Sequence, residues 1–339
     1  MIEVVAVRDT VLDHVIDQFE ALVASPSVRV HRIEAEALAS YEKISTTDLL
    51  IATVRSPITS VLLDRAARLR GVCFPTIGVE AIDVEDASRR GILIGHGATQ
   101  ENTISMAEAN VLLTLSLAFR FLKTEKMLRE GTPREDHVAY SLKGKTIGLL
   151  GFGRIAQETA RRLLPFEATL QCFSRSCLST EWDELVEQVS LDTLLRRSDF
   201  LLVLTTLSQE TRKMIGAAEL AKMKAKAFLI NTARGGIVDE CALVKALQAG
   251  RLAGAALDTF EVEPLPENSP LRHLENVVLT PHIIGHTVES LNSLLPTLVE
   301  NTRRMLSGHP PLRCKNPQAI PIWADRLASI EQKNRISLS

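Results

Sequence analysis

Short apolar runs rich in β-branched residues alternate with helix-like segments over the first hundred residues. Strands are predicted at residues 2–7, 49–54 and 72–74. Between the last two, the apolar residues of 60–69 recur at helical spacing. Strands that alternate with helices are typical of βαβ units, whose strands run parallel in one sheet. The pattern therefore predicts an α/β domain at the start of the chain.

One long helical pattern follows, over about residues 103–129. Large apolar residues recur along it at helical spacing and form a wide stripe. A wide stripe indicates that much of the helix is buried. Gly131 and Pro133 are expected to end it. A helix of this length can join one domain to the next.

The alternation of strands and helices starts again at Lys145. Six parallel strands with helical crossovers make a complete doubly wound sheet. After Gly285 the chain continues with a helical pattern and a Pro-rich segment that are too short for a third domain. This tail is expected to pack on the first domain, which is then discontinuous. The six strands are predicted at residues 146–150, 169–173, 200–204, 227–230, 254–257 and 277–279.

The charge balance argues against two classes of partner. Lys and Arg number 39 and Asp and Glu number 41, so the net charge is −2. A nucleic-acid binder or a protein of anionic membrane surfaces needs a basic excess or a basic patch. Aromatic residues make up 4% of the chain, too few for a base-stacking platform. The sequence predicts neither nucleic acid nor membrane as a partner.

Apolar runs and cysteines indicate the compartment. No apolar run approaches the roughly 18 residues of a membrane span, and the first residues, MIEVVAVRDT, lack a signal-peptide core. The five cysteines are scattered and lie mostly within apolar runs. They are interpreted as small buried residues of a protein in a reducing compartment, here the cytoplasm. No Cys/His spacing matches a zinc site, so no metal is expected.

A glycine turn follows the strand at 146–150. Gly151, Gly153 and Ala156 fit the pattern G-x-G-x-x-G/A. The first glycine allows a sharp turn, the second lets a pyrophosphate approach the backbone, and the small third residue lets a helix pack on the sheet. The N–H groups of Arg154 and Ile155 would then face the phosphates. Because the motif follows a strand and opens a helix, it predicts a dinucleotide site, whereas a tight turn without a ligand is the alternative.

The end of the next strand bears on the choice of dinucleotide. NAD-binding sheets carry an Asp or Glu about 20 residues after the glycine turn. Here Ser174 stands at that place and Arg175 follows. A hydroxyl and a guanidinium would bind a 2′-phosphate that a carboxylate would repel. NADP is therefore favoured over NAD, with a solvated surface arginine as the alternative.

Three later strand ends carry candidate catalytic chemistry. Arg234, Glu263 and His282 each follow a predicted strand, and ligands bind at the carboxyl ends of strands in such sheets. His282 would exchange a proton with a carbonyl or hydroxyl oxygen, and Glu263 would accept the other ring N–H. Arg234 would hold the carboxylate and carbonyl of a 2-oxo acid. Asp258 is placed better for the nicotinamide side.

Each of these side chains also has a structural interpretation. A histidine after proline is more often structural, the Glu263–Pro264 pair is compatible with a turn, and Arg234 is able to cap carbonyls. Their occurrence together at strand ends beyond a glycine turn favours catalysis. The chemistry that suits them is hydride exchange between a nicotinamide and a carbon that bears oxygen.

At these residues the chain resembles the D-isomer-specific 2-hydroxyacid dehydrogenase family. The resemblance spans residues from about 49 to 317 and depends most on INTARGGIVDE, GAALDTFEVEP and LTPHIIGHT. It implies the catalytic set Arg234, Glu263 and His282. It implies substrate contacts at Arg55, Ile77, Gly78 and Asn102. The implied cofactor contacts are Arg154, Ile155, Ser174, Thr205, Thr232, Ala233, Arg234, Asp258, His282 and Gly285.

The resemblance also implies the architecture. A Rossmann cofactor domain over 107–287 is inserted in a discontinuous, flavodoxin-like substrate domain over 1–106 and 288–339. Members are usually homodimers that associate through the cofactor domain. The implied activity is an NAD(P)-dependent oxidoreductase acting on a small 2-oxo or D-2-hydroxy acid.

Several positions depart from the family pattern and leave alternatives open. Thr76 replaces the usual first glycine of the carboxylate loop, and Thr99 and Gln100 replace a frequent Pro-Gly. The substrate therefore stays undetermined within the class. Corepressors that bind nicotinamide nucleotides share this architecture and the three catalytic residues, so a nucleotide-sensing protein with little turnover is the alternative.

Overall fold

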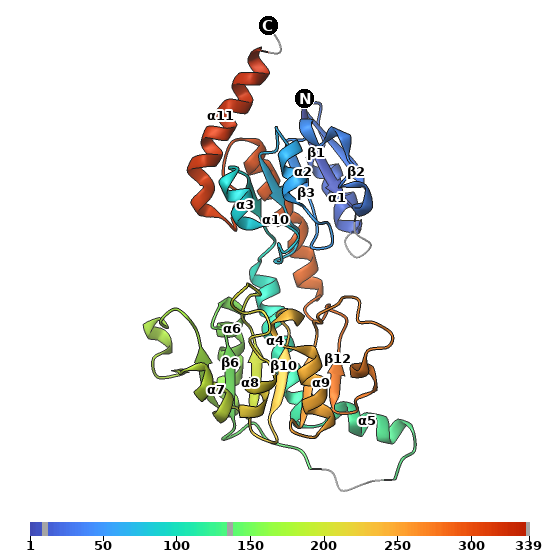
Figure 1. Ribbon diagram of the computed structural model, residues 1–339, viewed down its shortest axis with the longest axis vertical. Helices are drawn as coiled ribbons and strands as arrows, with labels where there is room; N and C mark the ends of the chain where they lie inside the picture. Colours follow the sequence, from blue (N-terminus) through green and yellow to red (C-terminus); the bar gives the residue numbers. More distant parts are fainter. Residues whose placement is uncertain (9–12, 134–137, 337–339) are drawn as a thin grey trace. The chain divides into compact units, whose positions relative to one another are not determined.

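The computed structural model describes residues 1–8, 13–133 and 138–336, and the chain divides into two compact units (Figure 1). Unit 1 consists of Met1–Glu101 and Val288–Ser339, and unit 2 of Asn102–Thr287. The sequence predicts the first boundary at 106–107 instead. Both positions lie inside helix α4 (Gln100–Ala118), which carries no breaker that would mark a boundary in the sequence.

Unit 1 contains a five-stranded parallel sheet in the order β2-β1-β3-β4-β5. This is the flavodoxin-like order. Two strands, β2 and β5, were not predicted: β2 alternates charged and apolar residues at the sheet edge, and β5 has only three residues. The strands are β1 (Ile2–Val7), β2 (Val28–Ile33), β3 (Leu49–Ile51), β4 (Gly71–Cys73) and β5 (Leu93–Gly95).

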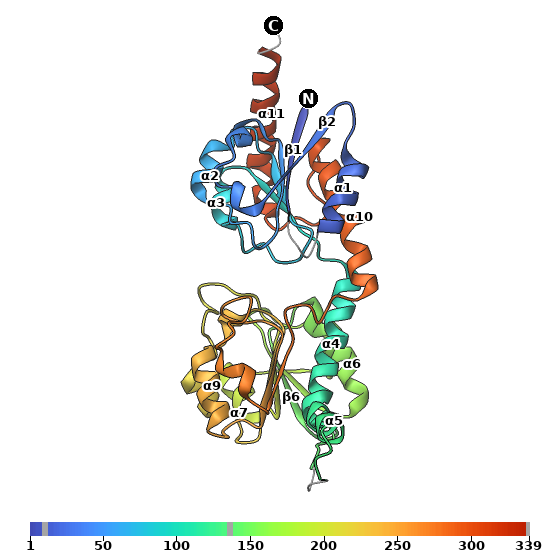
Figure 2. The same ribbon diagram turned by 90° about the vertical axis from the view of Figure 1, so that its right-hand side faces the viewer.

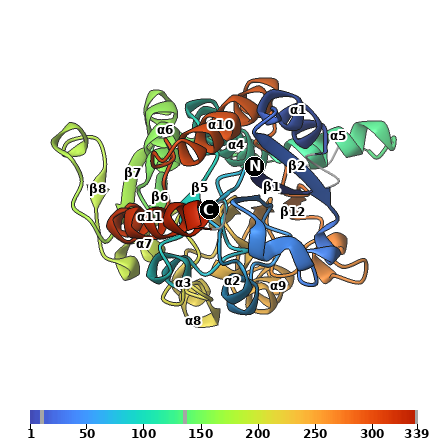
Figure 3. The same ribbon diagram turned by 90° about the horizontal axis from the view of Figure 1, so that it is seen from above.

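Helices cover both faces of this sheet. On one face α1 (Asp13–Val23), α10 (Val288–Leu306) and α11 (Ile320–Ile336) pack over β1 and β3, and α1 lies beside α10 (Figure 3). On the other face lie α2 (Ser60–Arg65) and α3 (Val84–Arg89). The tail therefore completes unit 1. Short 3₁₀ turns are η1 (Ala35–Ala37), η2 (Glu42–Thr46) and η7 (Pro317–Ala319).

Buried polar contacts fasten the tail to unit 1. The indole N–H of Trp323 donates to the carbonyl of Arg70 at 2.8 Å. Asn316, fully buried, accepts from the N–H of Ile94 at 2.9 Å and donates to the carbonyl of Ile92 at 2.9 Å. Because these groups would otherwise be buried without partners, the contacts fix where the tail docks.

Unit 2 contains a seven-stranded parallel sheet in the order β12-β11-β10-β9-β6-β7-β8. Counted from β6, this is the Rossmann order with one further strand at one edge. The further strand is β12, at one edge; β8, at the other edge, is the strand that the sequence does not predict, because it has only two residues and both are exposed. The strands are β6 (Thr146–Leu150), β7 (Thr169–Phe173), β8 (Glu187–Gln188), β9 (Phe200–Val203), β10 (Phe228–Asn231), β11 (Gly254–Leu257) and β12 (Val277–Leu279).

Helices cover both faces of the unit 2 sheet (Figure 2), and each face has its own hydrophobic cluster. α4 and α6 (Arg154–Leu163) pack on one face. α7 (Leu191–Arg197), α8 (Ala217–Lys222) and α9 (Glu240–Gln248) pack on the other. The remaining turns are η3 (Leu164–Phe166), η4 (Thr180–Trp182), η5 (Gly235–Ile237) and η6 (Pro270–His273).

The prediction of one helix over 103–129 is wrong. The chain forms α4 and then α5 (Phe121–Arg129), with an angle of 61° between them. Arg120 sits at the break with a φ of 48°, in the left-handed region that ends helices. The break separates a buried helix from an amphipathic one, since none of the residues of α5 is buried.

Candidate active site

The glycine turn after β6 is shaped by its neighbours. Gly151 has a φ of 98°, and its N–H donates to the carbonyl of Phe173 at the end of β7, at 2.9 Å. A β-carbon at Gly151 would lie 2.9 Å from the Cα of Thr205, which follows β9. The close approach and the positive φ both require glycine. Three loops, after β6, β7 and β9, therefore meet at this turn.

The start of α6 leaves room for an anion. Gly153 is the residue before the helix, it has no side chain to cap the first turn, and a β-carbon at Gly153 would meet no atom within 4 Å. The first N–H groups of a helix lack partners inside it and attract negative charge. Ala156 is buried against the sheet. These residues fit the pyrophosphate of a dinucleotide.

Ser174 and Arg175 directly follow the strand end that contacts Gly151. Ser174 is half-buried, its carbonyl accepts from the Gln188 side chain at 2.9 Å, and Arg175 is exposed. Arg175 also lies near the carboxylate of Glu210. The pKa of Glu210 lies below its ordinary value, mainly because the Ser208 hydroxyl donates to it, and the charge of Arg175 contributes. Both predicted residues thus follow directly after Phe173, whose carbonyl bonds to the glycine turn.

The turn that carries Arg234 is held by a buried asparagine. The Asn231 side chain donates to the carbonyl of Arg234 at 3.0 Å and accepts from the N–H of Ala233 at 3.1 Å. The guanidinium of Arg234 donates to the carbonyl of Ala233 at 2.6 Å. The next residue, Gly235, is packed so tightly that a β-carbon would collide with the backbone of Phe260. This contact brings the Arg234 turn against the loop that carries Glu263.

His282 and Glu263 are hydrogen-bonded across two loops. Nδ1 of His282 lies 2.7 Å from Oε2 of Glu263, and 37% and 34% of the two side chains are exposed. The other carboxylate oxygen, Oε1, accepts from the N–H of Phe260 at 3.0 Å. His282 has a φ of 59°, a conformation that residues other than glycine adopt uncommonly. The pair occupies Nδ1 and leaves Nε2 for another partner.

Burial raises the pKa of Glu263, but its contacts lower that pKa by more. Among the contacts, the hydrogen bond and charge of His282 have the largest effect, followed by the Phe260 N–H and the charge of Arg234. The pKa of Glu263 therefore lies below its ordinary value. Glu263 is therefore ionised near neutrality. The effect of Arg234 on this carboxyl also places the three predicted catalytic side chains in one neighbourhood.

Asp258 connects the ends of β11 and β12. It is buried, and its Oδ1 accepts from the Thr280 hydroxyl at 2.7 Å and from the N–H groups of Ile283 and Ile284 at 3.1 and 3.3 Å. Burial raises the pKa of Asp258, although these donors and the charge of His282 oppose the rise. Thr280 was not predicted as part of this site. Its position two residues before His282 is the feature of the sequence from which it could have been predicted.

Known proteins are similar to this chain over most of its length. The family model described as "D-isomer specific 2-hydroxyacid dehydrogenase, NAD binding domain" matches residues 111–283. A glyoxylate reductase of Thermofilum pendens is 38% identical over 289 residues, which cover 82% of this chain and 84% of that protein. The chain belongs to the D-isomer specific 2-hydroxyacid dehydrogenase family. It is an NAD(P)-dependent 2-hydroxyacid dehydrogenase.

Solved structures of the family match both units. An NADPH-dependent glyoxylate/hydroxypyruvate reductase from Sinorhizobium meliloti, in complex with NADP and malonate, has a TM-score of 0.82 at 27% identity and covers 93% of this chain and 97% of its own. A D-lactate dehydrogenase from Aquifex aeolicus, in complex with NAD and lactic acid, has a TM-score of 0.80 at 25% identity and covers 90% and 96%. Relatives thus occur with either nicotinamide cofactor.

The predicted substrate contacts of this dehydrogenase are divided between the units. Arg55, Ile77 and Gly78 follow β3 and β4 in unit 1, so they lie at the carboxyl edge of its sheet. Arg55 is exposed, and the Thr76 hydroxyl donates to the carbonyl of Gly78 at 3.4 Å. Asn102 lies in the first turn of α4, in unit 2.

Gly285 also belongs to unit 2 of this dehydrogenase. It packs against Met106 so closely that a β-carbon would collide with the methionine sulfur. His286, the next residue, interacts electrostatically with Asp258 and His282. Burial lowers the pKa of His286, the charge of His282 acts in the same direction, and that of Asp258 opposes both.

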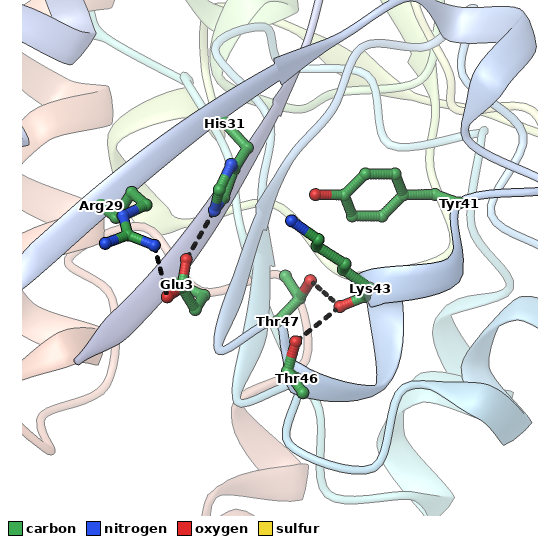
Figure 4. A pocket seen from close by; sticks show the side chains of 7 residues that line it. All are labelled: Glu3, Arg29, His31, Tyr41, Lys43, Thr46 and Thr47. Atoms are coloured by element: carbon green, nitrogen blue, oxygen red, sulfur yellow. Dashed lines mark hydrogen bonds and ion pairs between the residues drawn. The ribbon is translucent and has the colours of Figure 1, made fainter.

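Unit 1 contains a cavity of about 220 Å³ that no predicted site residue lines (Figure 4). The imidazole of His31 and the carboxylate of Glu3 pair along one wall at 2.6 Å, and Tyr41 and Lys43 approach from the opposite wall. The full lining consists of Glu3, Arg29, His31, Tyr41, Lys43, Thr46 and Thr47.

The residues that the structure describes hold neither a metal-binding cluster nor a single helix fit to cross a membrane. Within residues 1–8, 13–133 and 138–336, no three His, Cys, Asp or Glu side chains are grouped to hold a metal ion. In the same part of the chain no single helix is long and apolar enough to cross a membrane; α4 and α5 reach that composition only together, as a bent pair. Nine residues of α4 are buried within the protein itself.

The expectation that the cysteines are buried is only partly correct. All five are free, and Cys73 and Cys172 are buried. Cys177 and Cys241 are exposed, and Cys314 is half-buried. Exposure of Cys177 follows from its place in the loop after β7, and that of Cys241 from the outward face of α9.

Proposed function

We propose that this dehydrogenase interconverts a small 2-oxo acid and the D-2-hydroxy acid, with His282 as the acid and base. The observation that carries the proposal is the 2.7 Å contact between His282 Nδ1 and Glu263 beside Arg234. The nicotinamide supplies or accepts the hydride at the substrate carbon. In reduction, His282 gives a proton from Nε2 to the carbonyl oxygen, and in oxidation it takes that proton back.

The other side chains prepare this proton transfer. Glu263, ionised and bound to Nδ1, orients the ring and stabilises the imidazolium that oxidation forms. Arg234 binds the substrate carboxylate and carbonyl through its planar donors. Arg55, Ile77, Gly78 and Asn102 complete the substrate contacts. Unit 1 then serves as the substrate-binding domain.

The cofactor contacts follow from the loops that meet at the glycine turn. Gly151 and Gly153, with the N–H groups of Arg154 and Ile155, hold the pyrophosphate. Ser174 and Thr205 flank it. On the nicotinamide side we place Thr232, Ala233, Arg234, Asp258, His282 and Gly285. The cysteines, all free, are compatible with a location in the cytoplasm, which we also propose.

A panel of 2-oxo acids crossed with NADH and NADPH tests the function. We expect oxidation of the reduced nicotinamide with at least one of glyoxylate, hydroxypyruvate or phenylpyruvate, and a D-configured product on chiral chromatography. Tight nicotinamide binding without turnover on the whole panel would instead support the nucleotide-sensing alternative and refute the dehydrogenase proposal.

We propose NADP as the preferred cofactor. Replacing Arg175 by alanine is expected to lower the ratio of kcat/KM for NADPH to that for NADH by about 10-fold or more, because a charged hydrogen bond to the 2′-phosphate is lost. Arg196→Ala, which removes an exposed arginine on α7, is the matched control and should leave the ratio unchanged. An unchanged ratio in the Arg175 variant would assign that side chain to the solvated surface.

We propose that two chains associate through unit 2. Support comes from large apolar side chains exposed on α4, on α5 and at the break between them, namely Leu112, Phe119, Phe121, Leu122 and Leu128, the last 86% exposed. Exposed apolar groups of this kind mark association surfaces. Light scattering is expected to give twice the chain mass of 37.3 kDa, and a mass of one chain would refute the dimer.

A further inference from the structure

A chain of buried hydrogen bonds joins the Arg234 turn to the helix behind the glycine turn. The Thr232 hydroxyl donates to Oδ1 of Asn110 at 2.7 Å. Nδ2 of Asn110 donates to the Thr159 hydroxyl at 3.2 Å, and that hydroxyl donates to the carbonyl of Ile155 at 2.8 Å. Asn110 and Thr159 are fully buried, and Thr232 is 7% exposed. Every step lies within unit 2.

The position of Asn110 is unusual for a side chain of this polarity. It lies in α4, whose neighbouring buried residues Leu113 and Leu117 belong to a hydrophobic cluster. A buried amide is costly unless both of its ends are bonded. Here each end is bonded to a different functional segment, the acceptor to the turn before Arg234 and the donor to α6. If this position only had to fill space beside α4, an apolar side chain of similar size would suffice.

The direction of the bonds is fixed by the partners. The Thr159 proton is engaged by the carbonyl of Ile155, so the Thr159 oxygen serves as an acceptor for Nδ2. Oδ1 of Asn110 then faces the Thr232 hydroxyl, which donates. A fully satisfied buried network of this kind holds its members in one arrangement.

We propose that Asn110 is a positioning residue that holds the Arg234 turn in register with the cofactor end of α6. This inference rests on the proposed function of Arg234. Asn110 is fully buried, and it acts through its bonds to Thr232 and Thr159. Loss of these bonds would displace the Arg234 guanidinium relative to the pyrophosphate site, and small displacements of binding groups lower the rate of catalysis.

Three near-isosteric variants separate positioning from stability. Asn110→Leu removes both bonds, and Thr159→Val removes the α6 side only. Thr114→Val is the matched control: Thr114 is fully buried one turn along α4, and its hydroxyl donates only to the carbonyl of Asn110, at 2.7 Å, within the helix. All three lose a buried hydrogen bond, but only the first two break the chain between the functional segments.

The readouts are the melting temperature, the dissociation constant of the reduced nicotinamide from nucleotide fluorescence, and kcat and KM for a 2-oxo acid. In Asn110→Leu we expect kcat/KM to fall about 10-fold and nicotinamide binding to weaken severalfold. Thr159→Val should weaken nicotinamide binding and also lower kcat/KM, although Thr159 lies outside the Arg234 turn. The double variant should lose little more than Asn110→Leu, since both break one chain.

Thr114→Val is expected to lower the melting temperature while kcat/KM stays within about twofold of the parent. The inference is overturned if Asn110→Leu or Thr159→Val behaves kinetically as Thr114→Val does, or if the two losses add in the double variant. Should Asn110→Leu fail to fold, Thr159→Val decides alone. If Arg234→Ala itself leaves kcat/KM unchanged, the proposed role of Arg234 fails first, so the two failures are distinguishable.

Discussion

Replacing His282 by alanine is expected to lower kcat by roughly 10²–10⁴-fold, because the substrate oxygen loses its proton donor and acceptor. The dissociation constant of the nicotinamide should change little, because the glycine turn and the other proposed cofactor contacts stay in place and Glu263 keeps its bond to the N–H of Phe260. Steady-state kinetics with a saturating 2-oxo acid and a fluorescence titration with reduced nicotinamide measure the two quantities separately.

Two further variants sharpen this expectation. Glu263→Gln keeps the shape of the side chain but removes its charge, so the loss in kcat should be smaller than in His282→Ala. His273→Ala, at an exposed histidine of η6 in the same unit, should retain the parent activity. A His282 variant with near-parental kcat would remove this imidazole from proton transfer.

The convergence of Arg234, Glu263 and His282 could be predicted because it depends on strand order. β10, β11 and β12 are neighbours in the sheet, and each strand end bonds to the next: the Asp258 N–H donates to Asn231, and the Thr280 N–H to Leu257. Parallel strands place their carboxyl ends at one edge, where ligands bind. The glycine turn was predictable for a more local reason, because the spacing of its glycines is typical of a turn between a strand and a helix.

Contacts that depend on tertiary packing could not be predicted. Gly235 packs directly against the backbone of Phe260, where a side chain would collide, so the two loops lie together. No pattern in the sequence indicates this contact. In the sequence, Asn110 is likewise only one polar residue in a helical segment, and its hydrogen-bond partners lie 49 and 122 residues further along the chain. Such pairs become neighbours only after the sheet has formed.

Short or strained elements were missed for a different reason. β8 has two exposed residues, so it carries no apolar run for a strand prediction to detect. The break between α4 and α5 depends on a left-handed arginine at 120, a residue with no intrinsic preference for that conformation. Apolar periodicity continues across the break because α5 keeps its apolar side chains on the surface.

Replacing Arg234 by alanine is expected to raise the KM for the 2-oxo acid and to lower kcat/KM by roughly 10²–10³-fold, because a charged, two-point contact to the substrate is lost. Arg234→Lys keeps the charge without the planar fork, so it should recover only part of the loss. Kinetics over a range of 2-oxo acid concentrations separate the change in KM from the change in kcat.

Arg234→Ala and His282→Ala are expected to change different kinetic constants. The Asn231 side chain bonds to the carbonyl of Arg234, and the proposed role of the guanidinium is to bind the substrate, so its loss should act mainly on binding. Loss of the histidine should act on the proton transfer and therefore mainly on kcat. Arg196→Ala again serves as the arginine control. Kinetics of Arg234→Ala equal to those of the parent would mean that other groups hold the carboxylate, with the backbone at Ile77 and Gly78 as the first candidates.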